Sequence, residues 1–375
     1  MNRVPDWVPL EDCARALVVK MRHHGDVLLA APVLSALKAA NRRLEVDALV
    51  YDDTAPMLEG HPALSQLFTV GRGWRNSPFP ARLAAEWRLL SALRKRRYDL
   101  LVHLTEHPRG AWLARFLGPR YSVAPIIPRR RAFWRRSFTH DYPVVGFGRR
   151  HQVEINLDAL RRIGIQPPPE ERKVAFVPGK AAEARMRALV PHEGFIHVHP
   201  GSRWSFKCWP AAQNAQLIDR LAADGHRIVL TGAPDEVEFI DRILAATGAK
   251  PLNLAGQLSI KELGALIARA RLFVGVDSMP MHLAAALGIP TVALFGPSGD
   301  REWGPWRVAH RVVTTTHSCR PCGLAGCGDS GVSDCLVRLE VEPVYAAVRQ
   351  LLDPKGAKPG GVMVKALAVE MVSQA

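Results

Sequence analysis

The chain alternates short apolar, β-branched runs with longer stretches of helical periodicity, a pattern typical of parallel sheets with crossover helices. In the first half we expect helices at about 28–40, 54–60, 81–97 and 109–116 and strands at RALVVKM, LEVDALVY, YDLLVHL and YSVAPII. In the second half we expect helices near 210–224, 235–247, 259–270 and 279–287 and strands at GFIHVHP, HRIVLTG, PLNLAG, RLFVGVDS, TVALFG and HRVVTTT. The pattern predicts an α/β protein with two doubly wound, Rossmann-like domains.

A proline-rich segment of mixed charge, GIQPPPEERKVAFVPGK at 164–180, separates the two series and is the best linker candidate. We therefore expect a first domain over 1–170, a linker over 171–190, a second domain over 191–340, and a helix and tail over 341–375. Two such sheets would bind ligands in a cleft between the carboxyl ends of their strands.

Composition is that of a folded globular protein, with 48% hydrophobic and 23% charged residues. No apolar run reaches the roughly 18–20 residues that span a bilayer. The first 24 residues lack the apolar core and cleavage site of a secretory signal, so we expect a cytoplasmic protein.

The net charge of +15 is concentrated in the first half: residues 1–172 hold 28 Lys and Arg against 17 Asp and Glu, and residues 173–375 hold 22 against 18. The segment PRRRAFWRR contributes most, and we expect it to form a patch for a polyanion or a membrane surface. The expected patch residues are Arg129, Arg130, Arg131, Trp134, Arg135 and Arg136. The run RKRR at 94–97 is interpreted as a solvated face.

Polar residues follow the predicted strands, where α/β sheets bind ligands. After the first strand, Gly25 permits a tight turn and Asp26 stands at the start of a helix, where it is either an N-cap or a site residue. In HPGSRWSFKCWP, residues 199–210, Gly201 and Ser202 offer amides and a hydroxyl, and Lys207 a cation. These groups could bind a diphosphate. The alternative interpretation is a turn that carries surface cations and binds no ligand.

The stretch FVGVDSMPMHLAAALGIPTVALFGPSG, residues 273–299, interrupts an apolar strand and helix with three polar side chains. We interpret Asp277, Ser278 and His282 as a phosphate site at a helix N-terminus with unpaired amides. In LTGAPDE, Asp235 and Glu236 either cap a helix or accept hydrogen bonds from ribose hydroxyls.

Four cysteines follow the spacing C-x2-C-x4-C-x7-C; they are Cys319, Cys322, Cys327 and Cys335. The spacing fits a structural zinc site or a reduced, packed loop, and the sequence leaves both open.

Taken in order, GDVLLAAPVLSAL, HPGSRWSFKCWP, LTGAPDE, the segment from LAGQLSIKE to GPSGDREWGPW, and CRPCGLAGCG resemble the lipopolysaccharide core heptosyltransferases of glycosyltransferase family 9. The resemblance covers roughly residues 15–350, and SRWSFKCWP and GPSGDREWGPW are most similar to the heptosyltransferase III branch. It implies a GT-B fold and an inverting, metal-independent transfer of heptose from ADP-heptose to a hydroxyl of the lipopolysaccharide inner core.

The resemblance also implies roles for residues. Asp26 matches the general base, Lys207 the phosphate-contacting lysine, and Asp277 and Ser278 the acid and hydroxyl at the donor diphosphate, with His282 following. Glu236 falls near the ribose-binding residue, although Asp235 aligns nearly as well. The implied acceptor is the lipid A–core oligosaccharide, so we expect a peripheral protein on the inner face of the inner membrane.

Three alternatives remain at this point. Another heptosyltransferase branch fits the same motifs. The charge and the cysteines would fit a nucleic-acid-binding protein, but no recognisable nucleic-acid module is present, so no nucleic-acid partner is expected. A sugar-nucleotide epimerase with the same fold would turn over its substrate without an acceptor.

Overall fold

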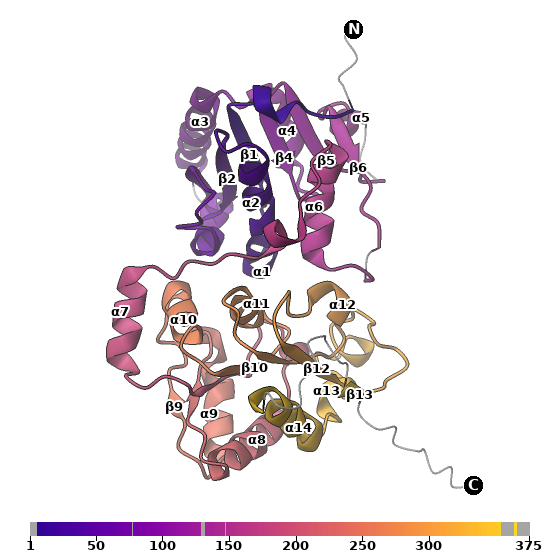
Figure 1. Cartoon of the computed structure of the whole chain (residues 1–375). Coiled ribbons are helices and arrows are strands. Elements are labelled where there is room, and N and C mark those ends of the chain that lie inside the picture. Colours follow the sequence, from indigo (N-terminus) through magenta and orange to yellow (C-terminus); the bar gives the residue numbers. More distant parts are fainter. Residues whose placement is uncertain (1–5, 77, 129–131, 147, 354–363, 366–375) are drawn as a thin grey trace, which may run out of the picture. The chain divides into compact units, whose positions relative to one another are not determined.

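The computed structural model describes residues 6–76, 78–128, 132–146, 148–353 and 364–365 of the 375. Contacts divide the chain into unit 1, Met1–Val177, and unit 2, Pro178–Ala375 (Figure 1). The segment 180–189, expected within a linker, is helical and lies in unit 2.

Unit 1 contains a six-stranded parallel sheet in the order β3-β2-β1-β4-β5-β6, the order of a Rossmann fold. Its strands are β1 (Arg15–Val19), β2 (Glu45–Tyr51), β3 (Gln66–Val70), β4 (Leu100–His103), β5 (Tyr121–Pro125) and β6 (His140–Tyr142). Its α-helices are α1 (His24–Leu28), α2 (Ala31–Ala40), α3 (Phe79–Arg96), α4 (Arg109–Leu117), α5 (Ala132–Arg135) and α6 (Gln152–Arg162).

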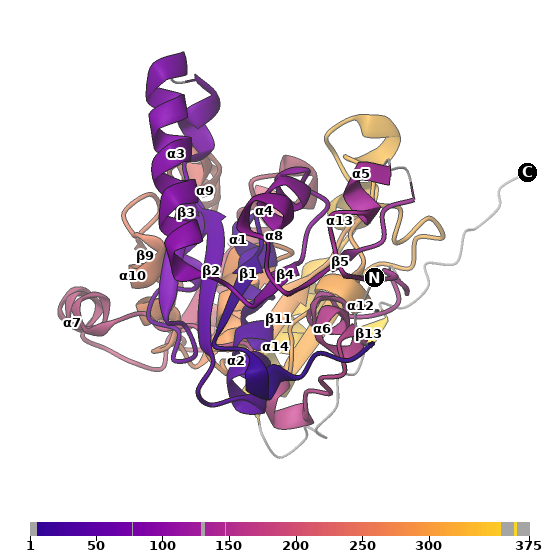
Figure 2. The same cartoon turned by 90° about the horizontal axis from the view of Figure 1, so that it is seen from above.

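Helices cover both faces of this sheet. Seen from above, α3, α4 and α5 lie on one face and α2 and α6 on the other (Figure 2). Leu89 and Leu93 of α3 and Leu113 of α4 pack with Leu17 and Val19 of β1 in one apolar cluster. Strands β1, β4 and β5 are buried on both faces, which explains their nearly continuous apolar sequences.

Unit 2 repeats this design with a parallel sheet in the order β13-β12-β11-β10-β7-β8-β9. Its strands are β7 (Ile196–His199), β8 (Ile228–Leu230), β9 (Leu252–Asn253), β10 (Leu272–Val276), β11 (Thr291–Leu294), β12 (His310–Thr314) and β13 (Val364–Lys365). Its α-helices are α7 (Lys180–Leu189), α8 (Ala211–Ala223), α9 (Val237–Ala246), α10 (Ile260–Ile267), α11 (Met279–Ala286), α12 (Asp300–Trp303), α13 (Asp334–Val337) and α14 (Val341–Leu352).

Successive side chains along the strands of unit 2 point to opposite faces of the sheet and pack in two apolar layers. Ile228 and Leu230 of β8 pack in the layer that contains α8, α9 and α14, whereas Val229 packs in the layer that contains α7 and α10. The prediction of two doubly wound α/β domains is thus confirmed. Three short strands, β3, β6 and β13, were not expected. The helix expected over 28–40 is α2, and the short helix α1 precedes it.

Candidate functional site

The sheet order of unit 2 brings two of the predicted motifs together. Strand β7 lies beside β10. From β7 the chain continues to β8, toward one edge of the sheet, and from β10 it continues to β11, toward the other edge. A crevice forms at the carboxyl ends of strands where the order reverses in this way, and α/β proteins bind ligands there. Gly201, Ser202 and the short 3-10 turn Ser205–Lys207 follow β7, and Asp277 and Ser278 follow β10.

Lys207 and Asp277 form an ion pair at this point, with 2.6 Å between Nζ and Oδ2. Asp277 is only 5% exposed, whereas the Lys207 side chain is 23% exposed. A short charge-assisted bond of this kind fixes the ammonium group while leaving its other N–H donors available. The arrangement gives this end of the sheet a positioned, partly exposed positive charge.

Helix α11 presents fewer amides than the sequence predicted. Ser278 is its N-cap, with an extended backbone, but its Oγ lies 3.4 Å from the Val276 carbonyl and caps no amide. Pro280 has no N–H, and the Met281 N–H donates to the Ser278 carbonyl. The groups offered here are therefore mainly side chains: the Ser278 hydroxyl and, one turn further along the same face, the buried imidazole of His282.

Gly201 and Glu236 lie against each other at the ends of β7 and β8. A Cβ atom on residue 201 would lie 2.5 Å from the Glu236 Cδ, so a side chain at 201 is excluded while the carboxylate keeps its place. Glu236 Oε2 accepts a hydrogen bond from the Ala233 N–H at 2.8 Å and lies 3.3 Å from His199 Nε2. Asp235 is exposed instead, so Glu236 is the acid that lies at the site.

A row of buried, hydrogen-bonded side chains holds Glu236 in position. The Thr231 Oγ1 lies 2.6 Å from His197 Nε2 and 2.8 Å from His199 Nδ1. Burial holds the pKa of His197 well below its usual value, so His197 is neutral. His199 Nε2 donates to Glu236, and the Thr231 hydroxyl links His199 Nδ1 to His197 Nε2.

This row of side chains also fixes the charge of Glu236. Burial raises the pKa of Glu236, but the hydrogen bond and charge of His199 and the Ala233 N–H outweigh that effect and leave the pKa below its ordinary value. Glu236 is therefore a carboxylate that can accept hydrogen bonds. Sequence reasoning missed His199, His197 and Thr231, although His199 is the first residue of HPGSRWSFKCWP.

Asp26 lies at the corresponding point of unit 1, where the sheet order reverses between β1 and β4. It stands in the first turn of α1, but the N-cap is His23, which makes no side-chain cap bond. The alternative that Asp26 is an N-cap is therefore wrong. The Asp26 side chain is 12% exposed, and its Oδ1 lies 3.8 Å from Arg22 Nε.

Lys20 is a fully buried cation near Asp26 that the sequence did not single out. Its Nζ donates to the Leu104 carbonyl at 3.2 Å and to Asn156 Oδ1 at 3.0 Å, and Asn156 Nδ2 donates to the Leu29 carbonyl. Burial lowers the pKa of Lys20 to about 8, although the charge of Asp26 opposes that shift. This polar cluster joins the segments that follow β1 and β4 to α6, and it lies close enough to Asp26 for the two charges to interact.

The predicted basic patch is changed by the burial of Trp134. Trp134 is 4% exposed, donates from Nε1 to the Pro125 carbonyl at 3.3 Å and packs on Phe138, with 5.0 Å between ring centroids. It therefore belongs to the core, because its large apolar ring fits between α5 and the sheet. Arg135 and Arg136 are exposed, and Arg129–Arg131 lie outside the described residues.

The four-cysteine segment gives no support for a zinc site. Cys335 is buried, whereas Cys319, Cys322 and Cys327 are exposed. Within the described ranges, no group of three or more His, Cys, Asp or Glu side chains is placed to hold a metal ion. Cys327 Sγ instead accepts the Asp334 N–H at 3.4 Å, an arrangement consistent with a reduced, packed loop.

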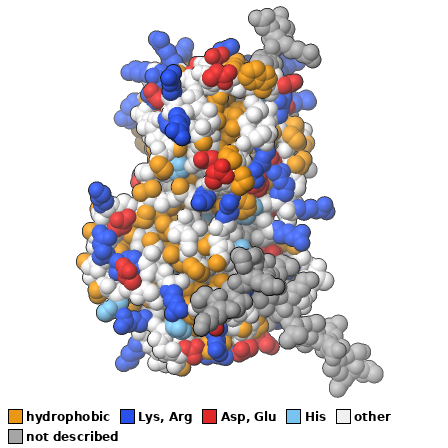
Figure 3. Space-filling view, viewed as in Figure 1, with side chains coloured by type: hydrophobic (Ala, Val, Ile, Leu, Met, Phe, Trp, Pro, Cys, Tyr) orange, Lys and Arg blue, Asp and Glu red, His pale blue; other side chains and the backbone are white. Residues whose placement is uncertain are grey.

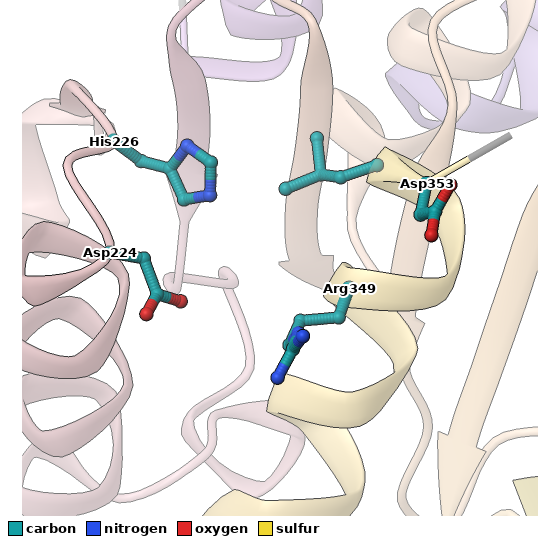
Figure 4. A pocket seen from close by; sticks show the side chains of 5 residues that line it. Asp224, His226, Arg349 and Asp353 are labelled. Atoms are coloured by element: carbon teal, nitrogen blue, oxygen red, sulfur yellow. The ribbon is translucent and has the colours of Figure 1, made fainter.

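A hollow elsewhere in unit 2 lies apart from this site. Asp224, His226, Arg349, Leu352 and Asp353 line it (Figure 4). Asp224 and His226 precede β8, so the hollow lies at the amino end of that strand, opposite to the end that carries Glu236. Among the described residues, no helix is both long and apolar enough to cross a membrane.

Comparison with protein families matches residues 86–330 to the model of glycosyltransferase family 9 (heptosyltransferase). The chain is 36% identical over 294 residues to lipopolysaccharide heptosyltransferase 3 of Escherichia coli, a match that covers 76% of this chain and 84% of that protein.

Solved structures of the same class have a similar fold. A glycosyltransferase family 9 protein from Veillonella parvula matches with a TM-score of 0.78 and 22% identity, covering 90% of this chain and 97% of that one. The E. coli heptosyltransferase WaaC, solved with ADP, matches with a TM-score of 0.71 and 23% identity, covering 90% and 99%. These likenesses identify the fold as GT-B.

Proposed function

The chain belongs to glycosyltransferase family 9, the heptosyltransferases, and we propose that it moves heptose from ADP-heptose to a hydroxyl of the lipopolysaccharide inner core. Its 36% identity to a lipopolysaccharide heptosyltransferase 3 supports that branch of the family. We propose the reaction to be inverting and to need no cofactor.

The observation that carries this proposal is the Lys207–Asp277 ion pair at the strand-order reversal of unit 2. A diphosphate placed there would meet the Lys207 ammonium, the Ser278 hydroxyl and His282. Gly201 and Ser202 would bring backbone amides and a second hydroxyl close to it, because they follow β7, the strand that pairs with β10. Glu236, held as a carboxylate by His199, would accept hydrogen bonds from the ribose hydroxyls.

The chemistry is a displacement at C1 of the heptose. The acceptor oxygen forms a bond to C1 while the bond from C1 to the β-phosphate oxygen breaks, and ADP leaves with the electron pair. Asp26, a carboxylate that follows the carboxyl end of β1, takes the proton of the attacking hydroxyl in this proposal. Lys207 and the neighbouring donors stabilise the negative charge that develops on the departing diphosphate.

The acceptor in this proposal is the lipid A–core oligosaccharide, a phosphorylated glycan anchored in a membrane. The enzyme would therefore act in the cytoplasm, peripherally bound to the anionic inner face of the inner membrane. The excess of positive charge in residues 1–172 suits both partners, because phosphates and anionic lipids attract the same cations. No nucleic-acid partner is proposed.

The test is direct transfer. Purified protein is incubated with ADP-heptose and a panel of core acceptors truncated at successive sugars, and the products are weighed by mass spectrometry. The proposal requires one heptose to be added and one ADP to be released per turnover with one member of the panel. Hydrolysis or epimerisation of the donor without any glycan product would refute it, and the acceptor that reacts identifies the branch.

A further inference from the structure

Unit 1 exposes a row of large apolar side chains on one helix. Phe79, Leu83 and Trp87 of α3 are 76%, 50% and 59% exposed. They are spaced at i, i+4 and i+8, so they form a single stripe along the first half of the helix. The core uses only the second half of α3, through Leu89 and Leu93. The stripe is therefore not required to attach α3 to the sheet.

The stripe continues onto the two neighbouring helices. Trp87 meets Phe116 of α4 edge to face, with 6.5 Å between ring centroids. Trp112 of α4, 65% exposed, packs on Phe133 of α5 at 4.8 Å. Trp112 and Phe116 are one turn apart on α4, so the two ring pairs form one aromatic surface. An exposed apolar surface of this extent marks an interaction site.

Cations surround the aromatic surface. The exposed ones on or next to α3 and α4 are Arg82, Arg88, Arg94, Lys95, Arg97, Arg115 and Arg120. In Figure 3, Lys and Arg side chains gather at the upper left, where Figure 1 places α3. Arg94 stacks over Phe116 at 5.2 Å, and Arg115 over Phe133 at 4.7 Å. The one acid of α3, Glu86, is paired with Arg109 of α4 and so does not offset these charges.

A groove of about 700 Å³ joins the cations to the rings. It runs between the carboxyl-terminal ends of α3 and α4, and Trp87, Phe116 and the side chains of Arg94, Lys95 and Arg97 line it. Basic residues at a helix C-terminus complement the helix dipole, which by itself accounts for the run at 94–97. The dipole gives no reason for Phe79, Leu83 and Trp87 to be exposed.

We infer that this aromatic surface docks on an anionic phospholipid bilayer. Tryptophan and arginine side chains combine apolar bodies with polar ends, which suits the headgroup region. Leu83 and Phe79 carry no polar group, which suits contact with acyl chains, whereas stacking on nucleic-acid bases would not use a leucine. The inference rests on the proposed function in one respect, namely that a lipid-linked acceptor would require the enzyme at a membrane.

Flotation of the full chain with vesicles tests the inference. One set of vesicles is phosphatidylcholine, and the other contains one third phosphatidylglycerol. Wild type should bind the anionic vesicles, and the triple variant Phe79→Ser/Leu83→Ser/Trp87→Ser should lose at least tenfold in partitioning. The double variant Arg94→Gln/Lys95→Gln should lose about twenty-fivefold at low salt, roughly fivefold for each cation removed.

Matched controls separate this surface from general effects. Leu189→Ser/Leu252→Ser removes two other exposed apolar residues, and Arg42→Gln/Arg43→Gln removes two other exposed cations; both should bind as wild type does. Binding by the triple variant equal to wild type would overturn the inference. So would a wild type that ignores both vesicle types or binds single-stranded RNA instead.

A second readout distinguishes failure of this inference from failure of the proposed function. With an acceptor freed of its acyl chains, the triple variant should transfer heptose at the wild-type rate. Vesicle binding without any transfer would leave the docking surface intact and refute the enzyme assignment. Transfer to the soluble acceptor without vesicle binding would support the enzyme assignment and refute the docking surface.

Discussion

Gly201 and Glu236 occupy adjoining space at the carboxyl ends of β7 and β8, and the carboxylate lies where a side chain of residue 201 would begin. The glycine is therefore needed for steric reasons, since its φ is not in the left-handed region. Glu236 in turn is held by His199 and the Ala233 N–H. The loop after β7, which contains Gly201, is therefore sterically complementary to the loop after β8, which contains Glu236.

Replacing Gly201 should disturb donor binding rather than the fold. In Gly201→Ala the new Cβ would lie 2.5 Å from the Glu236 Cδ, so the carboxylate must move away from His199. We expect the KM for ADP-heptose to rise about tenfold, the loss of roughly one charge-assisted hydrogen bond. Steady-state kinetics and calorimetric titration with ADP measure this. Gly248→Ala, where the nearest atom is 3.9 Å away, should leave both unchanged.

Lys207 should be the residue of unit 2 whose loss lowers the rate most. Lys207→Met removes a positioned cation from the leaving group, and we expect kcat/KM to fall by about 10²–10³. The substitution also leaves the almost fully buried carboxylate of Asp277 without its partner. We expect this loss to lower the unfolding free energy by about 3 kcal/mol. Transfer assays and urea unfolding measure the two effects.

The double variant Lys207→Met/Asp277→Asn separates the two roles. Because the buried charge is removed with its partner, stability should return toward wild type, while activity stays low. Recovery of activity together with stability would mean that Lys207 only supports the fold. Stability that stays low in the double variant would mean that the ion pair is not what Lys207→Met damages.

The sheet strands could be predicted because they are buried on both faces and so carry long apolar runs, as in Leu272–Val276. Strand β3 escaped prediction because Gln66 and Thr69 are exposed and break the run. Strand β6 has three residues, His140–Tyr142, and no apolar run at all. Helix α7 follows a proline-rich segment whose composition indicated a linker.

The candidate site could be predicted only one motif at a time. Each polar residue after a strand was visible, but the ion pair of Lys207 with Asp277 joins residues 70 positions apart, and only the sheet order brings them together. Trp134 was wrongly placed on a surface because its neighbours are arginines, whereas its contacts are buried. Thr231 and Lys20 carry no local signal, since their roles come from tertiary packing.

Asp26→Asn tests the general base with an isosteric side chain. We expect kcat to fall by about 10²–10⁴, because the amide cannot take the proton of the acceptor hydroxyl. The Kd for ADP should change less than twofold, since the donor residues lie in unit 2. Glu11→Gln, which neutralises an exposed acid of unit 1, serves as the control. Wild-type turnover in Asp26→Asn would remove Asp26 from the mechanism.

The thiols of the four-cysteine segment should react as their exposure dictates. Cys319, Cys322 and Cys327 are exposed and should be modified by a disulfide reagent at pH 8 within minutes. Burial raises the pKa of Cys335 to about 11, so this thiol should react far more slowly in the folded protein. A colorimetric thiol assay combined with elemental analysis tests this. One equivalent of zinc, with fast modification appearing only after chelation, would restore the zinc interpretation.

Lys20 should make folding stability rise with pH in the alkaline range. Its pKa is about 8 in the folded protein against 10.5 ordinarily, so between these values the unfolded chain binds a proton that the folded chain does not. The contribution of this group to the unfolding free energy therefore increases from pH 8 to 10.5, by roughly 3 kcal/mol.

Other groups titrate in the same range, and a difference measurement removes them. Cys13, Cys208 and Cys335 have pKa values raised by burial to about 11, which lowers stability over part of this window in any variant that retains them. Lys20→Met keeps those groups, so the wild-type unfolding free energy minus that of the variant should grow as pH rises from 7 to 10. Urea unfolding at several pH values gives this difference. A difference independent of pH would mean that Lys20 holds its proton through this range, and hence that the buried cluster around Lys20 stays positively charged.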